Sequence, residues 1–170
     1  AYAAAKVKEK LVIAGAGELR DQLIALAHEC GVGDRVMLPG FFENPYPLMR
    51  GAELVVLSSS IEGFPNALVE AMALGRPTIA TNSASGPSEI LAEAPRESIT
   101  DLTFAAHGVL TPVGSVERMA EALSAMADPE RRRVYAAKGP LRVEAYSAKG
   151  AKDRYWAVIR DALQNAPQRR

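Results

Sequence analysis

Residues 58–77 read SSSIEGFPNALVEAMALGRP, a polar turn followed by an apolar segment. The turn follows Leu54-Val55-Val56-Leu57, an apolar run of the length of a strand buried on both faces. Pro65 suits the first position of a helix, and the apolar spacing predicts a helix over residues 65–74. A second apolar strand is expected at residues 78–81. Strand, helix and strand in this order indicate parallel strands joined by a helix.

The same alternation extends outward in both directions. Strands are expected at residues 11–14, 35–38, 54–57, 78–81 and 109–111, and helices from residue 18, around 47–49, and at 65–74, 87–91, 116–127, 129–138 and 143–164. Residues 92–108 are interpreted as a long surface loop, and Gly139-Pro140 as a break between the last two helices. The predicted fold class is α/β, a Rossmann-like open parallel sheet with helices on both faces.

Composition excludes several classes of protein. The chain has 170 residues, enough for one domain with its own core, and equal numbers of basic and acidic side chains, 20 each. This balance lacks the clustered positive charge of a nucleic-acid-binding protein.

The lone Cys30 excludes a disulfide framework, favours a cytoplasmic location and is expected to lie in the core. The sequence contains no run of about 18 apolar residues, the length that a membrane-spanning helix needs. His28 is expected on the surface of a helix and His107 in a loop, and neither is expected to be a metal ligand.

A glycine turn follows the first predicted strand. Gly15 and Gly17 precede a predicted helix, an arrangement that often cradles phosphate. Arg20, however, stands where a dinucleotide-binding turn requires Gly or Ala, and no acidic residue follows the second strand at the required distance. On the pattern alone, a simple tight turn is favoured over an NAD site.

Two glutamates flank the predicted helix start after the third strand. Glu70 is the one charged residue on an otherwise apolar helix, so it is expected to be partly buried, and a ligand with two hydroxyl donors would satisfy it. Glu62 precedes the helix N-terminus, where Gly63 permits a ligand to approach closely and backbone N–H groups attract anions. The alternative is that Glu62 is a loop acid and Glu70 a solvated helix residue.

These residues carry a resemblance to a known family. The pattern Ser-x-x-Glu-Gly-Phe-Pro-Asn-x-x-x-Glu-Ala-Met-Ala-x-Gly-x-Pro over residues 59–77, followed by Ser-Gly-Pro-Ser-Glu-Ile-Leu at 85–91, resembles the C-terminal domain of the retaining GT-B glycosyltransferases of group 1, also called family 4. The similarity covers nearly the whole chain apart from residues 92–107 and the last few residues. Two departures are Ser88, where an Arg is common in the family, and Asn82, where an Asp is common.

The resemblance implies that the domain binds a nucleotide-sugar donor without a metal or other cofactor. Glu70 would hold the ribose hydroxyls, and Glu62 would contact the donor sugar. Glu62 is the candidate catalytic residue as a covalent nucleophile, although the family favours a front-face mechanism in which the leaving phosphate helps to deprotonate the acceptor. The remaining donor-binding residues would be Gly15 and Gly17 near the nucleotide, Gly40-Phe41 near the base, and the backbone of Gly63, Phe64, Pro65 and Asn66 at the sugar and diphosphate.

In the family this domain opens with a further strand and a loop whose Arg and Lys grip the diphosphate. Residues 1–170 are therefore interpreted as a single donor-binding domain, a fragment of a longer two-domain enzyme that lacks its first strand and its N-terminal acceptor domain. Because that strand would be central, strands 11–14 and 54–57 are expected to pair with each other or with a strand from another chain.

The expected reaction is hexosyl transfer to a glycan or lipid-linked acceptor. The protein would be cytoplasmic, with peripheral contact to the inner face of the membrane, and nucleic acid is not an expected partner. The alternative is a stand-alone, non-catalytic module that binds a nucleotide-sugar or another protein.

Overall fold

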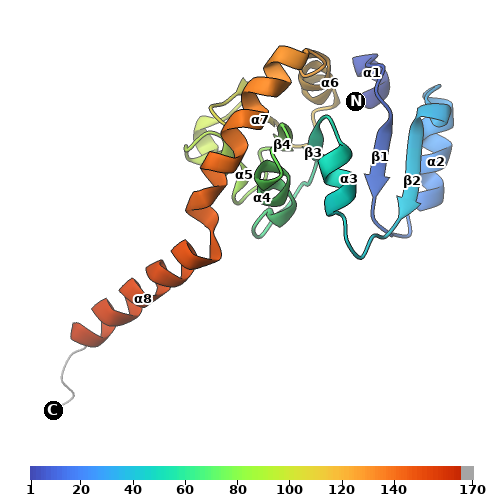
Figure 1. Ribbon diagram of the computed structural model, residues 1–170. Coiled ribbons are helices and arrows are strands. Elements are labelled where there is room, and N and C mark those ends of the chain that lie inside the picture. Colours follow the sequence, from blue (N-terminus) through green and yellow to red (C-terminus); the bar gives the residue numbers. More distant parts are fainter. Residues whose placement is uncertain (166–170) are drawn as a thin grey trace.

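The computed structural model describes residues 1–165 and has an α/β architecture (Figure 1). The strands are β1 (Leu11–Ala14), β2 (Val36–Gly40), β3 (Val55–Leu57), β4 (Thr78–Thr81), β5 (Thr103–Phe104) and β6 (Val109–Thr111). The helices are α1 (Tyr2–Ala5), α2 (Arg20–Glu29), α3 (Tyr46–Gly51), α4 (Asn66–Ala73), α5 (Pro87–Leu91), α6 (Val116–Ala125), α7 (Pro129–Val143) and α8 (Ala148–Gln164). Short 3-10 helices lie at η1 (Gly33–Arg35), η2 (Arg96–Ser98) and η3 (Glu144–Tyr146).

The larger sheet has the strand order β3-β4-β6-β5, and its first three strands are parallel. Because β4 has a partner on each side and helices on each face, all four of its residues are buried. Successive residues of the inner strands face opposite sides of the sheet. Ala80 and Leu110 join one core cluster with side chains of α4 and α5, and Ile79 and Val109 join another with side chains of α6 and α7. The predicted sheet with helices on both faces is confirmed here.

The smaller sheet pairs β1 with β2 in parallel, and it is less buried than the sequence predicts. The burial of β1 alternates along the strand, with Val12 36% exposed. In the larger sheet, β3 has Val56 36% exposed, so the expectation that residues 54–57 form a strand buried on both faces is wrong. The helix that packs on the smaller sheet, α2, leaves Leu19 60% and Leu26 53% exposed, and Cys30 is exposed rather than in the core. A two-stranded sheet offers too little apolar surface to cover these side chains.

The two sheets do not join. No pairing links β1 to β3 within residues 1–165, so the expectation that these strands close on each other is wrong, and the alternative of a strand from another chain stays a prediction. Arg132 of α7 instead bridges the starts of both strands, with Nη1 3.6 Å from Glu9 Oε1 and Nη2 2.5 Å from Glu53 Oε2. Ser124 of α6 also donates to the carbonyl of Ala5 at 3.0 Å. Side chains therefore hold the smaller sheet at a fixed place beside the larger one.

The segment 92–108 is not only a surface loop, because it contains η2 and the short strand β5, which pairs antiparallel with β6. Asn82 anchors this segment, since its Nδ2 donates to the carbonyls of Arg96 at 3.0 Å and Ile99 at 2.8 Å. An aspartate at this position could not donate these two hydrogen bonds. The amide at position 82 therefore fits the long segment that follows it.

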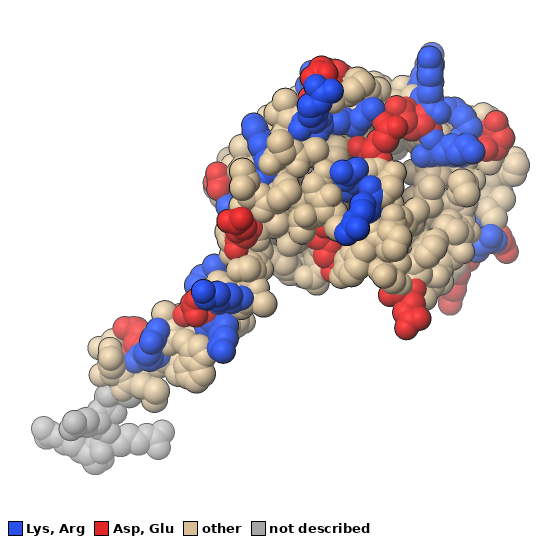
Figure 2. Space-filling view, viewed as in Figure 1, with Lys and Arg blue, Asp and Glu red and all other residues tan. Residues whose placement is uncertain are grey.

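The last helix, α8, extends away from the body of the molecule (Figure 1). It contains no buried residue, and its aromatic residues Tyr155 and Trp156 are 73% and 51% exposed. Figure 2 shows Lys and Arg interspersed with Asp and Glu over the visible face, including α8. Within the described residues, no helix is long and apolar enough to cross a membrane.

The predicted helix break at Gly139-Pro140 is wrong, because α7 continues through both residues to Val143. The missing N–H of Pro140 costs one helical hydrogen bond. In return, Gly139 lets α7 pass close to α4: a Cβ on Gly139 would lie 2.9 Å from the carbonyl oxygen of Met72 and 3.3 Å from its Cα. Packing against α4 thus decides the course of this helix.

We expect Gly139→Ala to lower the free energy of unfolding, although alanine is about 1 kcal/mol better than glycine in a helix. The new methyl group would press on the backbone of Met72, and such overpacking costs about 1–3 kcal/mol. Urea unfolding followed by circular dichroism measures the difference. Gly51→Ala, at the open end of α3, is the matched control and should not destabilise the chain. A stabilised Gly139→Ala variant would contradict this account of the α4–α7 contact.

Candidate functional site

The loop between β3 and α4 carries most of the predicted site residues. It is anchored at its two ends. Thr81 Oγ1 donates to the carbonyls of Ser59 at 2.5 Å and Leu57 at 3.3 Å, and Pro65 is buried against Gly86, where any Cβ would collide with the proline ring. Glu62, between the two anchors, is partly exposed. The loop therefore presents a carboxylate at the carboxyl end of β3, next to the start of a helix.

The backbone at the start of α4 is less open to a ligand than the sequence predicts. Pro65 occupies the N-cap position and has no N–H, and the N–H of Asn66 donates to the carbonyl of Phe64 at 2.9 Å. The N–H of Asn66 is thus already paired within the chain, and its contact with a ligand stays a prediction. Within residues 1–165, no backbone carbonyl accepts from the N–H of Gly63 or Phe64. Within the same residues the N–H of Ala67, the second residue of α4, also has no backbone acceptor, so three N–H groups are available at the helix start.

Glu70 lies on the first turns of α4 and is partly exposed. Its Oε1 accepts a hydrogen bond of 3.3 Å from the hydroxyl of Tyr46, the first residue of α3. The prediction of a partly buried glutamate is confirmed, and the tyrosine hydroxyl supplies one hydrogen-bond donor. The other carboxylate oxygen is free to accept from a ligand, and Tyr46 could yield its place to a second ligand hydroxyl.

The glycines after β1 lie in the smaller sheet. Gly15 has a backbone φ of +138°, a value that residues other than glycine rarely adopt. Its N–H donates to the carbonyl of Gly40 at 2.9 Å. A Cβ on Gly15, Gly17 or Gly40 would meet no atom within 4 Å, so the space beside each of them is open. The turns after β1 and β2 therefore lie side by side, with open space next to the backbone of these glycines.

The structure brings the predicted residues into two groups. Glu62, Gly63, Phe64, Pro65, Asn66 and Glu70 share the β3–α4 loop and helix, whereas Gly15 and Gly17 belong to the other sheet. α3, which follows β2 in the chain, reaches from one group to the other through the Tyr46–Glu70 hydrogen bond. Within residues 1–165, no cluster of three or more His, Cys, Asp or Glu side chains is placed to hold a metal ion.

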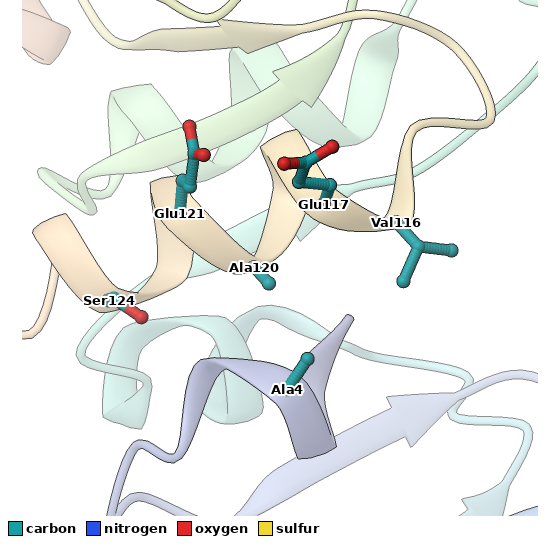
Figure 3. Close-up of a pocket in the computed structure, with 6 residues that line it drawn as sticks. All are labelled: Ala4, Val116, Glu117, Ala120, Glu121 and Ser124. Atoms are coloured by element: carbon teal, nitrogen blue, oxygen red, sulfur yellow. The ribbon is translucent and has the colours of Figure 1, made fainter.

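A wide hollow of about 660 Å³ lies elsewhere, between α1 and α6 (Figure 3). The side chains along it are Ala4, Val116, Glu117, Ala120, Glu121 and Ser124. None of the predicted site residues lines it. It is the open seam where the N-terminal helix crosses α6, and we do not assign the donor site to it.

Sequence reasoning missed two tyrosines at this site. Tyr46 binds Glu70, and Tyr146 of η3 stacks against Phe64 with ring centroids 5.8 Å apart. Asn44-Pro45 before Tyr46 is a local turn signal, since Asn44 Oδ1 accepts from the N–H of Tyr46 at 3.1 Å. No sequence signal places Tyr146 beside a loop so distant in the chain.

The family model described as "Glycosyl transferases group 1" matches residues 2–142. A curated relative from Campylobacter jejuni, N-acetylgalactosamine-N,N'-diacetylbacillosaminyl-diphospho-undecaprenol 4-alpha-N-acetylgalactosaminyltransferase, is 33% identical over 165 residues, which is 96% of this chain and 40% of the relative. Alpha-D-kanosaminyltransferase of Streptomyces kanamyceticus is 30% identical over 156 residues, 89% of this chain and 37% of the relative. The chain thus spans about two fifths of the length of these relatives.

Solved structures share the fold. Anabaena HepE, crystallised in complex with UDP, matches with a TM-score of 0.77 and 20% identity over 94% of this chain and 43% of its own. The lipopolysaccharide outer core galactosyltransferase WaaB, in its apo form, matches with a TM-score of 0.74 and 21% identity over 94% of this chain and 43% of its own.

Proposed function

Since this chain belongs to the glycosyl transferases of group 1, we propose that it is the donor-binding half of a retaining glycosyltransferase. The reaction is transfer of a hexosyl group from a nucleoside-diphosphate sugar to a glycan or lipid-linked acceptor. The observation that carries the proposal is the start of α4, where Glu62, the free N–H groups of Gly63 and Phe64, and Glu70 follow one another along one loop and helix.

Each group has a chemical task in this proposal. The carboxylate of Glu70 accepts hydrogen bonds from the two ribose hydroxyls, which would displace Tyr46 from Oε1. Glu62 accepts from hydroxyls of the donor sugar and lies closest to the reacting carbon. Gly15 and Gly17, with Gly40 beside them, border the nucleotide. The UDP named in the Anabaena HepE complex supports a nucleoside diphosphate as the ligand class.

The leaving diphosphate develops negative charge as the glycosidic bond breaks. The N–H groups of Gly63 and Phe64 and the positive end of α4 are preorganised donors that can stabilise this charge. We propose that the reaction needs no metal ion for this reason.

The acceptor class is proposed from the relatives. The Campylobacter relative's name describes a diphospho-undecaprenol-linked acceptor, and WaaB is described as a lipopolysaccharide outer core galactosyltransferase. These names support a lipid-linked or polysaccharide acceptor for this protein too. Such an acceptor suits a cytoplasmic enzyme in peripheral contact with the inner face of the membrane.

Ligand-observed NMR tests the donor class. The 170-residue chain is titrated to millimolar concentration with UDP-glucose, GDP-mannose and ADP-glucose. We expect saturable binding of one nucleotide class, competed by the matching nucleoside diphosphate. If none of the three binds, the titration is repeated on the complete protein, and absence of binding there would overturn the proposal.

A further inference from the structure

The C-terminal end of α7 and the turn η3 lie against the loop that precedes α4. The ring of Tyr146 in η3 packs against the ring of Phe64, with centroids 5.8 Å apart and planes inclined at 49°. Phe64 adjoins Gly63, whose N–H, like its own, is free of backbone partners within residues 1–165. The side chain of Phe64 is otherwise 46% exposed. Tyr146 is therefore the aromatic neighbour of a residue in the proposed donor loop.

Tyr146 itself is held firmly by Arg142, one turn earlier on α7. The guanidinium of Arg142 donates from Nη2 to Tyr146 Oη at 3.0 Å and to the carbonyl of Glu89 at 2.6 Å, and from Nε to the carbonyl of Ile90 at 2.9 Å. Its Nη1 pairs with Glu93 Oε1 at 2.8 Å, while the Arg142 side chain is only 16% exposed. Tyr146 is thus tied to the end of α5 as well as to α7.

The surroundings of Tyr146 suit a fixed, uncharged ring. Its side chain packs against the core cluster that contains Leu68 and Met72 of α4. Burial raises the pKa of the Tyr146 hydroxyl above its ordinary value, against the opposing effect of Arg142, so the group stays protonated at neutral pH. The Tyr146 ring therefore contacts both the core cluster that contains Leu68 and Met72 and the loop that precedes α4.

The loop that precedes α4 is held by few hydrogen bonds of its own backbone. Within residues 1–165, no backbone hydrogen bond involves residues 60–63, between the carbonyl of Ser59, which Thr81 holds, and the carbonyl of Phe64, which accepts from Asn66. Gly63 adds conformational freedom to this span. The position of the Gly63 and Phe64 N–H groups then depends on side-chain contacts, among which the Phe64–Tyr146 stack is the aromatic one.

We propose that Tyr146 is a positioning residue for the donor loop: by stacking on Phe64 it fixes the backbone N–H groups that meet the sugar diphosphate. This inference rests on the proposed function. A displacement of about 1 Å in such a group can cost up to about 100-fold in rate, so even a modest loosening of the loop is measurable.

The test compares three variants of the chain. Tyr146→Ala removes the ring, and Tyr146→Phe keeps the ring but loses the hydrogen bond from Arg142. Tyr135→Ala is the matched control, because Tyr135 is a buried tyrosine on α7, the helix that leads into η3, but belongs to the core cluster on the other side of the sheet. The dissociation constants of UDP, GDP and ADP are measured by NMR at a temperature at which all variants are folded.

We expect Tyr146→Ala to weaken the best-bound of the three nucleotides about tenfold, and Tyr146→Phe to restore affinity to within about twofold of the native chain. Tyr135→Ala should lose stability without losing affinity. In the complete enzyme, Tyr146→Ala should lower kcat more than it raises KM for the donor, because the N–H groups meet charge that grows in the transition state. A purely structural role would make Tyr146→Ala and Tyr135→Ala alike.

A second measurement needs no ligand. The NMR order parameters of the Gly63 and Phe64 N–H groups should be lower in Tyr146→Ala than in the native chain and unchanged in Tyr135→Ala. Unchanged order parameters would overturn the positioning role even if no nucleotide bound. Conversely, native affinity in Tyr146→Ala together with loss of binding in Glu70→Ala would leave the donor site standing and overturn only this inference.

Discussion

Glu70→Ala should abolish binding of the nucleotide-sugar donor. The carboxylate would accept two charge-assisted hydrogen bonds from the ribose, together worth about 3 kcal/mol or about 100-fold in affinity. Because affinity in this chain is expected to be millimolar at best, a loss of that size removes the signal altogether. The measurement is saturation-transfer NMR with the nucleotide-sugar that the native chain binds.

Two variants define what that loss means. Tyr46→Phe removes the hydroxyl that donates to Glu70 at 3.3 Å, and since the ribose would take its place, affinity should change by no more than about twofold. Glu29→Ala removes an exposed carboxylate at the far end of α2 and should leave binding unchanged. If Glu70→Ala bound the donor as the native chain does, the ribose would be held elsewhere and the assignment of the site would be wrong.

The central part of the fold could be read directly from the sequence. The bounds of β4, α5 and β6 agree with the predicted residues 78–81, 87–91 and 109–111. Each is a short apolar segment bounded by Gly, Pro or polar residues, and each is buried in the middle of the domain. Local pattern and tertiary environment point the same way there, which makes prediction reliable.

The sequence misled where packing overrides local preference or where apolar residues lack a cover. Gly139-Pro140 is a strong break signal, yet the contact of Gly139 with Met72 keeps α7 continuous. The apolar residues of β1 and α8 predict burial, but neither element has a neighbour within residues 1–165 that covers it. Apolar periodicity predicts which face of an element is buried, but it does not predict which other element covers that face.

The candidate site shows the same division. Glu62 and Glu70 are conspicuous because a charge in an apolar helix and an acid before a helix start are chemically informative in themselves. The supporting tyrosines, Tyr46 and Tyr146, act through contacts between distant segments. The hydrogen bond within the backbone at Asn66 depends on loop geometry, which no spacing rule specifies.

Replacement of Glu62 by glutamine should have the largest effect on turnover. The amide has nearly the shape of the carboxylate, so the donor sugar still binds, but it cannot stabilise the positive charge that develops on the sugar as the diphosphate leaves. Loss of one such preorganised group lowers rates by about 100- to 1,000-fold. In the complete glycosyltransferase, we expect Glu62→Gln to lower kcat by this factor and to change the donor dissociation constant less than about threefold.

A second variant, Glu62→Ala, distinguishes the two mechanisms open to Glu62. If Glu62 is a covalent nucleophile, azide added to Glu62→Ala should occupy the space left by the shortened side chain, displace the nucleoside diphosphate and yield a glycosyl azide of inverted configuration at a measurable rate. In a front-face mechanism, azide rescues nothing, because the leaving phosphate rather than Glu62 assists the acceptor. Glu29→Gln, at an exposed position on α2, controls for the change of charge. If Glu62→Gln weakened donor binding and left kcat unchanged, Glu62 would be a binding residue and not a catalytic one, because the ground state and the transition state would then use the carboxylate to the same extent.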